Sequence, residues 1–332
     1  MRSIRLLFAV LAFIGIASAQ AQPPKPYQYF RAGNPADSGP VKTQPGYALM
    51  GGGDDLDEAF QFLCDRAVGG DLVVLRAHGD DEYNPYIQKL CHLNSVATLI
   101  LPTRQAAMDP FVGATLRKAS AIFIAGGDQS NYINFWSGTP VQEAINEAVR
   151  AGKPIGGTSA GLAILTEYGY SCQGDAPEDA DLVSQLVLDD PFHKRVTIEH
   201  GFIQIPILKG LISDTHFAIR DRMGRTLVFS ARIKKDGAAV RTVAVQERAS
   251  VLVTPDGKAR VVGFGPAYFI DPAQASGTVE KGQPLTFGPY AVQKVTPGHS
   301  FDLNTWTGES TAYTLTVTKG KITSTQPGGS IY

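Results

Sequence analysis

The sequence predicts an α/β protein with a mostly parallel sheet covered by helices on both faces, followed by a small β-rich C-terminal appendage. Between about Tyr47 and Ser159, short segments that are apolar throughout alternate with segments of helical periodicity. This alternation is typical of parallel strands buried on both faces. From about Pro284, apolar and polar residues alternate instead, which indicates strands with one buried face.

The expected elements follow one another in a regular order. In the first half we expect strands at 47–50, 71–77, 96–101 and 121–125, and helices at 56–68, 85–94, 110–119 and 140–151. After Gly174 the pattern predicts a helix at 217–233, short strands at 240–246, 250–254 and 260–263, and tail strands at 285–287, 290–295 and 312–318. Ligand sites in parallel sheets lie at the carboxyl ends of the strands. The glycine-rich segments at Gly51, Gly126 and Gly156 should therefore converge there.

The first residues are typical of an export signal. Arg2 and Arg5 precede an apolar run from Leu6 to Ile16, and small residues follow it at 17–21. This pattern predicts a signal peptide over residues 1–21, cleaved after Ala19 or Ala21, and a secreted or periplasmic mature protein. A membrane anchor is disfavoured because the run is too short to span a bilayer comfortably. We then expect a loosely ordered lead-in at 22–44, the α/β domain at 45–283 and a β-rich extension at 284–332.

Composition excludes several functions. The formal net charge is −1, and lysines and arginines are scattered, so the chain shows no nucleic-acid or membrane-binding surface. No Cys/His cluster has metal-ligand spacing, so we expect neither a metal nor a cofactor. The three cysteines are Cys64, Cys91 and Cys172. Cys64 and Cys91 lie in apolar helical patterns and could form a disulfide or remain buried thiols.

The most informative motif is Pro154-Ile-Gly-Gly-Thr-Ser-Ala-Gly-Leu. It places Ser159 on a sharp turn between a strand and a helix, where Gly157 and Gly161 remove side chains that would collide. Such a turn exposes a nucleophilic hydroxyl. The backbone N–H of Ala160 would point toward the oxygen of an attacked carbonyl.

A serine nucleophile needs a base, and the base needs an orienting acid. His216 is the best of the six histidines, because polar residues precede it at the expected start of a helix. His78, after the second strand, comes next, and His200 also follows an expected strand; His92, His193 and His299 lie in surface-like contexts. Glu247 ends an apolar strand, so it is either a functional acid or a solvated strand end.

Four segments together resemble cyanophycinase, a family of serine peptidases related to aspartyl dipeptidase. They are Gly126-Gly-Asp-Gln129, Gly157-Thr-Ser-Ala-Gly161, Asp214-Thr-His-Phe217 with three arginines, and Gln246-Glu247. The resemblance runs from about Tyr47 to Asp271 and implies a class I glutamine amidotransferase-like fold with 45–283 as the peptidase domain. The order Ser–His–Glu differs from the Ser–acid–His order of α/β-hydrolases.

The resemblance also implies roles for individual residues. Ser159 would be the nucleophile, His216 the base and Glu247 the acid, with an oxyanion hole from Ala160 and from Gly127 or Asp128. The residues in or around the substrate pocket would be Gln129, Asp214, Thr215, Arg220, Arg222 and Arg225. The family usually has glutamine at the position of Thr215 and lysine at that of Ile133.

These residues lead to a functional expectation. We expect a secreted serine peptidase that hydrolyses β-aspartyl-arginine linkages of the polyamide cyanophycin through an acyl-enzyme. A homodimer is compatible with this expectation. Arg220, one helical turn after His216, should pair with an acidic substrate group. The alternatives are an exopeptidase for another acidic dipeptide or isopeptide, and a secreted binding protein with an inactive site.

Overall fold

The computed structural model describes residues 25–176 and 181–332. The expected signal peptide at 1–21 lies outside these residues. The helices are α1 (Asp57–Ala67), α2 (Tyr83–Leu90), α3 (Arg104–Ala107), α4 (Pro110–Lys118), α5 (Gln129–Trp136), α6 (Pro140–Arg150), α7 (Ala160–Ala163), α8 (Ser184–Asp189) and α9 (Met223–Lys235). None of the helices in this part of the chain is long and apolar enough to cross a membrane.

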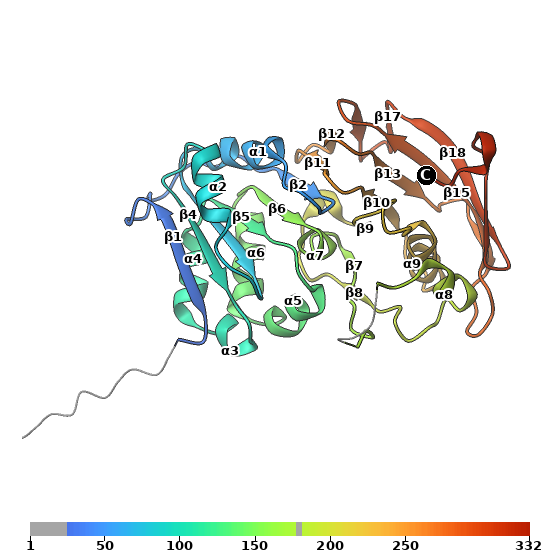
Figure 1. Cartoon of the computed structure of the whole chain (residues 1–332), viewed down its shortest axis with the longest axis horizontal. Helices are drawn as coiled ribbons and strands as arrows, with labels where there is room; N and C mark the ends of the chain where they lie inside the picture. The colour runs from blue at the N-terminus through green and yellow to red at the C-terminus, as the bar shows by residue number, and fades with distance from the viewer. Residues whose placement is uncertain (1–24, 177–180) are drawn as a thin grey trace, which may run out of the picture.

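The strands form two large sheets (Figure 1). Those of the first half are β1 (Gln28–Gly33), β2 (Tyr47–Met50), β3 (Asp71–Arg76), β4 (Ser95–Ile100), β5 (Ala121–Ile124), β6 (Ile155–Thr158) and β7 (Tyr168–Tyr170). They are followed by β8 (Ile198–His200), β9 (Leu211–Asp214), β10 (Arg241–Val245), β11 (Ala249–Val253), β12 (Lys258–Gly263), β13 (Ala267–Asp271) and β14 (Ser276–Thr278). The last are β15 (Thr286–Val295), β16 (Ser300–Asp302), β17 (Thr307–Gly308), β18 (Thr311–Thr318) and β19 (Lys321–Ser324).

The first sheet has a parallel centre and antiparallel flanks. Its ten strands follow the order β1-β4-β3-β5-β6-β2-β11-β12-β16-β17. The strands from β4 to β2 in this order run parallel to their neighbours, whereas β1 and the strands from β11 onward pair antiparallel. The expectation of a mostly parallel sheet was therefore wrong for the whole protein. It holds only for the segment in which strands are connected by helices.

Side chains of the parallel strands alternate between two hydrophobic cores. On β3, Leu72 and Val74 pack in the core that includes α1 and α2, while Val73 and Leu75 pack in the core that includes α4 and α6. All four are almost fully buried. Because successive side chains of a strand point to opposite faces, uniformly apolar strands require helices on both faces. The structure has them (Figure 1).

The second sheet follows the order β19-β18-β15-β13-β10-β9-β7-β8, with β14 paired to β15. Only β10 with β9 and β7 with β9 run parallel, and the other pairs are antiparallel. Helices α8 and α9 pack on this sheet around a third core that contains Phe229, Tyr268 and Tyr290. Unlike the parallel strands of the first sheet, consecutive strands of the second sheet are not all connected by helices.

Residues 284–332 are β-rich, but they do not form an appendage. Within them, β15 and β18 extend the second sheet from β13, and β16 pairs with β12 of the first sheet. The tail therefore supplies strands to both sheets. The alternating pattern indicates strands with one buried face, as in β18, but the pattern does not identify the partner strands.

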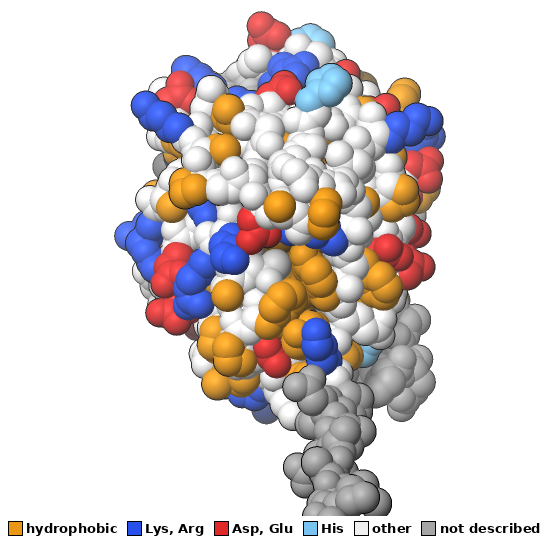
Figure 2. All heavy atoms as spheres, turned by 90° about the vertical axis from the view of Figure 1, so that its left-hand side faces the viewer, with side chains coloured by type: hydrophobic (Ala, Val, Ile, Leu, Met, Phe, Trp, Pro, Cys, Tyr) orange, Lys and Arg blue, Asp and Glu red, His pale blue; other side chains and the backbone are white. Residues whose placement is uncertain are grey.

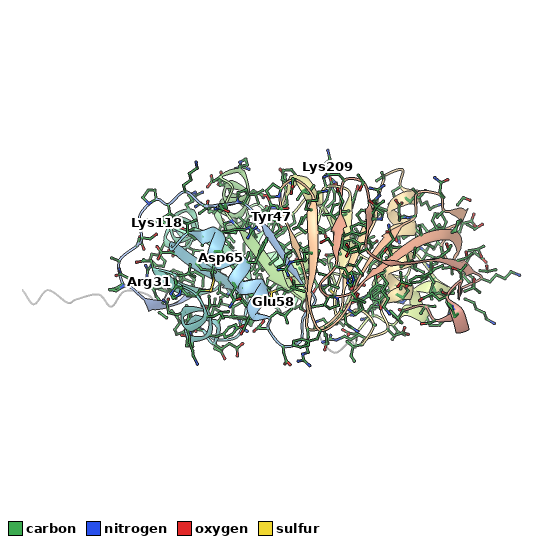
Figure 3. The ribbon with its side chains drawn as sticks, turned by 90° about the horizontal axis from the view of Figure 1, so that it is seen from above. Arg31, Tyr47, Glu58, Asp65, Lys118 and Lys209 are labelled. Carbon is green, nitrogen blue, oxygen red and sulfur yellow. A yellow bond between two sulfur atoms is a disulfide. The ribbon has the colours of Figure 1, made fainter. Side chains whose placement is uncertain are left out.

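The expected lead-in at 22–44 contains an ordered strand. β1 pairs with β4 through six residues, and Arg31 lies 3.2 Å from the carboxylate of Asp71. Arg31 and Lys118, at the same end of the molecule in Figure 3, each lie 3.0 Å from Asp37. On this end, which faces the viewer in Figure 2, hydrophobic side chains gather between charged ones, and Phe111 of α4 stacks on Tyr27. These contacts explain the order of a segment rich in turn-forming residues.

Candidate active site

Ser159 lies on a strained turn between β6 and α7. Its backbone has φ 52° and ψ −116°, a conformation that non-glycine residues rarely adopt. The glycines beside it are needed for space. A methyl group on Gly161 would lie 2.0 Å from the carbonyl oxygen of Ile124, and one on Gly157 would lie 2.6 Å from the carbonyl of Gly161. The turn can therefore form only where strand and helix approach without side chains.

His216 lies 2.7 Å from the serine, measured from Nε2 to Ser159 Oγ. It is not on a helix. The helix expected at 217–233 begins only at Met223, and residues 216–221 form turns with positive φ at His216 and Asp221. The backbone N–H of His216 donates to the carbonyl of Gly51 instead of continuing a helix. This tertiary hydrogen bond places the imidazole above the serine.

Glu247 lies on the far side of the imidazole. Its Oε1 is 2.6 Å from His216 Nδ1, and it sits in the turn between β10 and β11. The His216 side chain is 9% exposed and that of Glu247 is 29% exposed. A carboxylate at Nδ1 fixes the tautomer that leaves Nε2 free to accept a proton. Glu247 is thus a partner of the histidine and not a strand end facing only solvent.

The segment after β2 holds base and acid in register. Gly51 accepts a hydrogen bond from the backbone of His216, and Gly52 accepts one from the backbone of Arg248, next to Glu247. A methyl group on Gly51 would lie 2.0 Å from the carbonyl oxygen of Gln246. The close approach of three backbones at this strand end requires glycine. The sequence predicted that Gly51 lies near the site but not that this segment links the two catalytic candidates.

The environment of His216 lowers its pKa. Burial is the main cause, and the nearby positive charges of Arg220 and Arg222 act in the same direction, while the hydrogen bond to Glu247 opposes them. A lowered pKa keeps the imidazole neutral at neutral pH. Neutral imidazole is the form that can accept a proton from Ser159.

The other histidine candidates lie elsewhere. The ring of His78 faces Phe135 at a centroid distance of 6.5 Å, and its carbonyl accepts from Arg76. His200 lies 3.2 Å from Glu167 with its side chain 62% exposed. Of the three candidates, the structure brings only His216 within hydrogen-bonding distance of Ser159.

The segment after β5 approaches the serine from the other side. A methyl group on Gly126 would lie 3.5 Å from Ser159 Cβ, and Gly127 has φ +151°. Gly127, Asp128 and Ala160 line the same cavity as Ser159. Within the described residues, the N–H groups of Gly127 and Ala160 have no hydrogen-bond partner, so both can donate to an oxyanion. Asp128 caps α5 by accepting from the N–H of Ser130.

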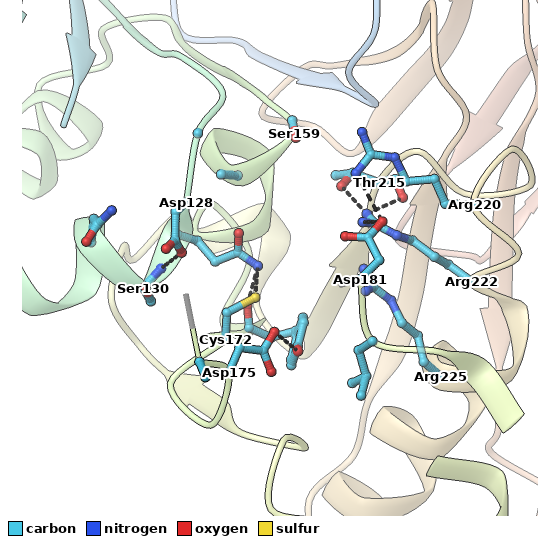
Figure 4. Close-up of a pocket in the computed structure, with 17 residues that line it drawn as sticks. Asp128, Ser130, Ser159, Cys172, Asp175, Asp181, Thr215, Arg220, Arg222 and Arg225 are labelled. Carbon is cyan, nitrogen blue, oxygen red and sulfur yellow. Dashed lines mark hydrogen bonds and ion pairs between the residues drawn. The ribbon is translucent and has the colours of Figure 1, made fainter. Parts of the chain in front are cut away.

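The cavity beside Ser159 has a volume of about 490 Å³ and a polar lining (Figure 4). Besides the residues above, Thr215, Arg220, Arg222, Arg225 and Gln129 contribute to its wall, as the resemblance implied. If the predicted helix had begun at residue 217, Arg222 and Arg225 would point away from His216. Because residues 216–221 form turns, all three arginines reach the cavity.

Asp214 lies behind this wall and holds Arg225. The Arg225 guanidinium donates to both carboxylate oxygens of Asp214, at 2.9 and 2.5 Å, and Thr226 donates to the same carboxylate. Both charged side chains are 4% exposed. Burial acts to raise the pKa of Asp214, but the charge of Arg225 and its hydrogen bonds prevail and lower it. Asp214 therefore positions Arg225 and does not line the cavity itself.

The opposite wall combines the predicted Gln129 with Tyr170, Cys172 and Asp175, which the sequence did not identify. Gln129 donates to the carbonyl of Tyr170 at 3.1 Å and to the sulfur of Cys172 at 2.9 Å. Tyr170 donates to Asp175, which also lies 2.6 Å from Arg195. Tyr170 ends β7, Cys172 and Asp175 follow it, and the three carry no recognisable motif. Ile133, at the position of the family's lysine, is 7% exposed in the hydrophobic core and does not line the cavity.

Two further observations concern metals and cysteines. Among residues 25–176 and 181–332, no group of three or more His, Cys, Asp or Glu side chains is arranged to hold a metal ion. Cys64 and Cys91, for which two states were expected as alternatives, form a disulfide between α1 and the end of α2. Cys172 is the free cysteine of the described part, and burial raises its pKa to about 12.

Comparisons with known proteins indicate a peptidase family. Residues 77–187, which include Ser159, match peptidase family S51. A cyanophycinase of Synechococcus elongatus is 27% identical over 272 residues, covering 77% of this chain and 78% of its own. A cyanophycinase of Nostoc is 28% identical over 213 residues, covering 63% and 65%.

A solved structure shares the fold. The crystal structure of a peptidase from an acI-B1 Actinobacterium superposes with a TM-score of 0.50 at 17% identity, covering 79% of this chain and 98% of the other. The family match and the relatives indicate a serine-type peptidase. The protein is a cyanophycinase-like serine peptidase.

Proposed function

We propose that the protein hydrolyses β-aspartyl-arginine linkages of cyanophycin, with Ser159, His216 and Glu247 as its triad. The observation that carries this proposal is the continuous hydrogen-bonded chain from Ser159 Oγ through His216 to Glu247, at the edge of a charged cavity. The relatives named cyanophycinase support the choice of polymer.

The reaction begins when Ser159 Oγ attacks the amide carbonyl carbon while His216 Nε2 takes the serine proton. The carbonyl oxygen becomes an oxyanion, which the N–H groups of Ala160 and Gly127 stabilise. Collapse of this intermediate breaks the C–N bond, and His216 returns the proton to the leaving amine. Water then attacks the ester, again through His216, and releases the acid and Ser159. Glu247 stays ionised and stabilises the imidazolium.

The charge pattern of the cavity suits a substrate that carries both signs. Three arginines (Arg220, Arg222 and Arg225) and three aspartates (Asp128, Asp175 and Asp181) line it. A β-aspartyl-arginine unit carries a carboxylate and a guanidinium a few bonds from its scissile amide. Charge-assisted hydrogen bonds to such groups contribute about 1.5–3 kcal/mol each.

A direct assay tests the proposal. Purified protein is incubated with cyanophycin, with Ser159→Ala as the control, and the products are identified by mass. Release of β-Asp-Arg dipeptides by the unmodified protein alone is the expected result. The second candidate function is that of an exopeptidase for another acidic dipeptide or isopeptide. It would be favoured if the polymer stayed intact while another β-aspartyl dipeptide or an isopeptide was cleaved. Thr215 and Ile133, which replace the family's glutamine and lysine, are the observations behind that candidate.

The same proposal includes export. The charged and apolar pattern of residues 1–21 supports it, and so does the disulfide between Cys64 and Cys91, because disulfides persist in oxidising compartments. N-terminal sequencing of secreted or periplasmic protein should return Gln20 or Gln22 as the first residue. A first residue of Met1 would refute cleavage.

A further inference from the structure

Asp181 makes a contact in the cavity that the proposed reaction does not use. Its Oδ2 accepts from Arg220 Nη1 at 3.1 Å and from Arg222 Nη2 at 2.8 Å (Figure 4). One carboxylate oxygen thus bridges two guanidinium groups that line the cavity beside Ser159. Asp181 precedes α8 and belongs to neither a helix nor a strand. The bridge places a protein carboxylate where two cationic side chains of the pocket converge.

The Asp181 bridge differs from the other ion pair of the arginine wall. The Asp214 carboxylate is 4% exposed and is held by Arg225 and Thr226, so it is part of the interior. The Asp181 side chain is 51% exposed, and that of its partner Arg220 is 42% exposed. The pair with Arg220 is exposed on both sides, and such pairs contribute roughly 0–1 kcal/mol, so a competing carboxylate can replace Asp181 at Arg220 at little cost.

Arg222 does not need Asp181 to keep its place. Its Nη1 donates to the carbonyl and the hydroxyl of Thr215 at 2.9 and 3.2 Å, and the side chain is 8% exposed. Its Nε is buried and has no hydrogen-bond partner among the residues that the structure describes. Arg220 also lies 3.7 Å from Glu247. The cationic wall would therefore persist if the Asp181 carboxylate were absent.

We propose that Asp181 is a specificity-determining residue, an internal carboxylate that competes with the acidic group of the substrate for Arg220 and Arg222. The inference rests on the proposed function, because it assumes that these arginines receive a substrate carboxylate. An incoming ligand must displace Asp181 or bind beside its negative charge. Either event lowers the affinity for simple carboxylates. It favours ligands with a second charged group, such as a guanidinium that can pair with Asp128 or Asp175 of the cavity.

Asp181 competes as a charged group. Its partial burial acts to raise its pKa, but the charges and hydrogen bonds of Arg222 and Arg220 prevail and lower it. The carboxylate is therefore ionised at neutral pH.

The test compares Asp181→Asn with Asp181→Glu and with a charge-matched control. Asp189→Asn is that control, because the substitution removes the same charge. Asp189 is exposed on the nearby α8, and it contacts Gln185 instead of lining the cavity. The probe is succinate, and its binding to the purified full-length protein is measured by calorimetry. We expect Asp181→Asn to bind succinate roughly 5- to 50-fold more tightly, corresponding to about 1–2.3 kcal/mol, while Asp181→Glu and Asp189→Asn bind like the unmodified protein.

A lower succinate affinity in Asp181→Asn would identify a positioning role for Asp181. Equal or weaker succinate binding by Asp181→Asn, or none at all, overturns the inference, since a residue that merely orients the arginines would lower the affinity when removed. The binding assay needs no turnover, so it separates this inference from the proposed function. If the unmodified protein leaves cyanophycin intact while Asp181→Asn gains succinate affinity, only the polymer assignment fails. If cyanophycin is cleaved and the KM rises in Asp181→Asn, only the competition fails.

Discussion

The imidazole of His216 lies directly against the backbone of Gly52. A methyl group on Gly52 would lie 2.3 Å from the ring Cε1 and 2.5 Å from Nε2. Gly52 also has φ +94°. The same glycine segment after β2 therefore accepts the backbone hydrogen bonds of His216 and of Arg248, next to the acid, and leaves the space that the imidazole occupies.

Gly52→Ala should consequently reduce kcat far more than it reduces stability. The added methyl group must push the ring away from Ser159, and a displacement of about 1 Å can cost roughly 100-fold in rate. Steady-state kinetics on cyanophycin, with circular dichroism as a check of folding, measure the effect. Gly201→Ala separates strain from collision, because Gly201 has φ +72° and no atom within 4 Å of the added carbon. A similar loss in both variants would show that strain, and not the collision, is responsible.

Removal of either end of the Ser159–His216 pair should have the same large effect. Ser159→Ala and His216→Ala should each lower kcat by roughly 10⁴- to 10⁶-fold, and the double variant should lose little more, because the two groups act as a unit. His78→Ala is the control, since its ring faces Phe135 instead of the serine. Substantial activity in Ser159→Ala, or a larger loss in His78→Ala than in His216→Ala, would contradict the triad.

Local patterns were sufficient to predict the centre of the fold. The strands and helices predicted between Tyr47 and Arg150 lie within a few residues of their expected bounds, because their apolar periodicity and their glycine or proline boundaries are encoded in adjacent residues, whereas the short helices α3 and α5 were not predicted. The turn at Ser159 was predicted for the same reason. The match includes positions such as Pro110 and Pro140, which begin helices as prolines in the first turn do.

What the sequence did not reveal depends on contacts between distant segments. The turn at His216 replaces a helix because its N–H bonds to Gly51, and the strands of the tail are distributed over two sheets. Asp175 and Asp181 reach the cavity from a segment without periodicity or motif. A resemblance indicates which residues belong to a site, but their pairing, as in Asp214 with Arg225, becomes apparent only in three dimensions.

The acid limb of the pH–rate profile should respond to Arg220. The base must be neutral, so kcat/KM falls as pH drops through the pKa of His216, which burial, Arg220 and Arg222 lower from its ordinary value. Removing one positive charge in Arg220→Gln should raise this pKa, and the acid limb should move to higher pH. Arg248→Gln serves as control, because Arg248 follows Glu247 in sequence but pairs with Asp54. A limb that stays in place or moves to lower pH would contradict this reading of the electrostatics.

The ion pair between Asp214 and Arg225 should be essential for stability. Asp214→Asn leaves a guanidinium in the interior without its counter-charge, and breaking such a buried pair typically costs about 3–5 kcal/mol. Urea unfolding measures the loss. Glu143→Gln provides the contrast, because Glu143 is 62% exposed in its pair with Arg117, and surface pairs contribute roughly 0–1 kcal/mol. Equal midpoints for the two variants would show that Arg225 finds another partner or solvent when Asp214 is neutral.

The disulfide between Cys64 and Cys91 should stabilise the parallel half of the protein. It joins residues 27 positions apart, and closing a loop of this size in the unfolded chain contributes about 2–4 kcal/mol. The double variant Cys64→Ser and Cys91→Ser should unfold at a correspondingly lower urea concentration in non-reducing buffer. A reductant should lower the midpoint of the unmodified protein toward that of the variant and leave the variant unchanged. Cys172 is present in both proteins, so a reductant effect that persisted in the double variant would have to come from Cys172. Identical midpoints of the two proteins without reductant would show that the disulfide adds no stability.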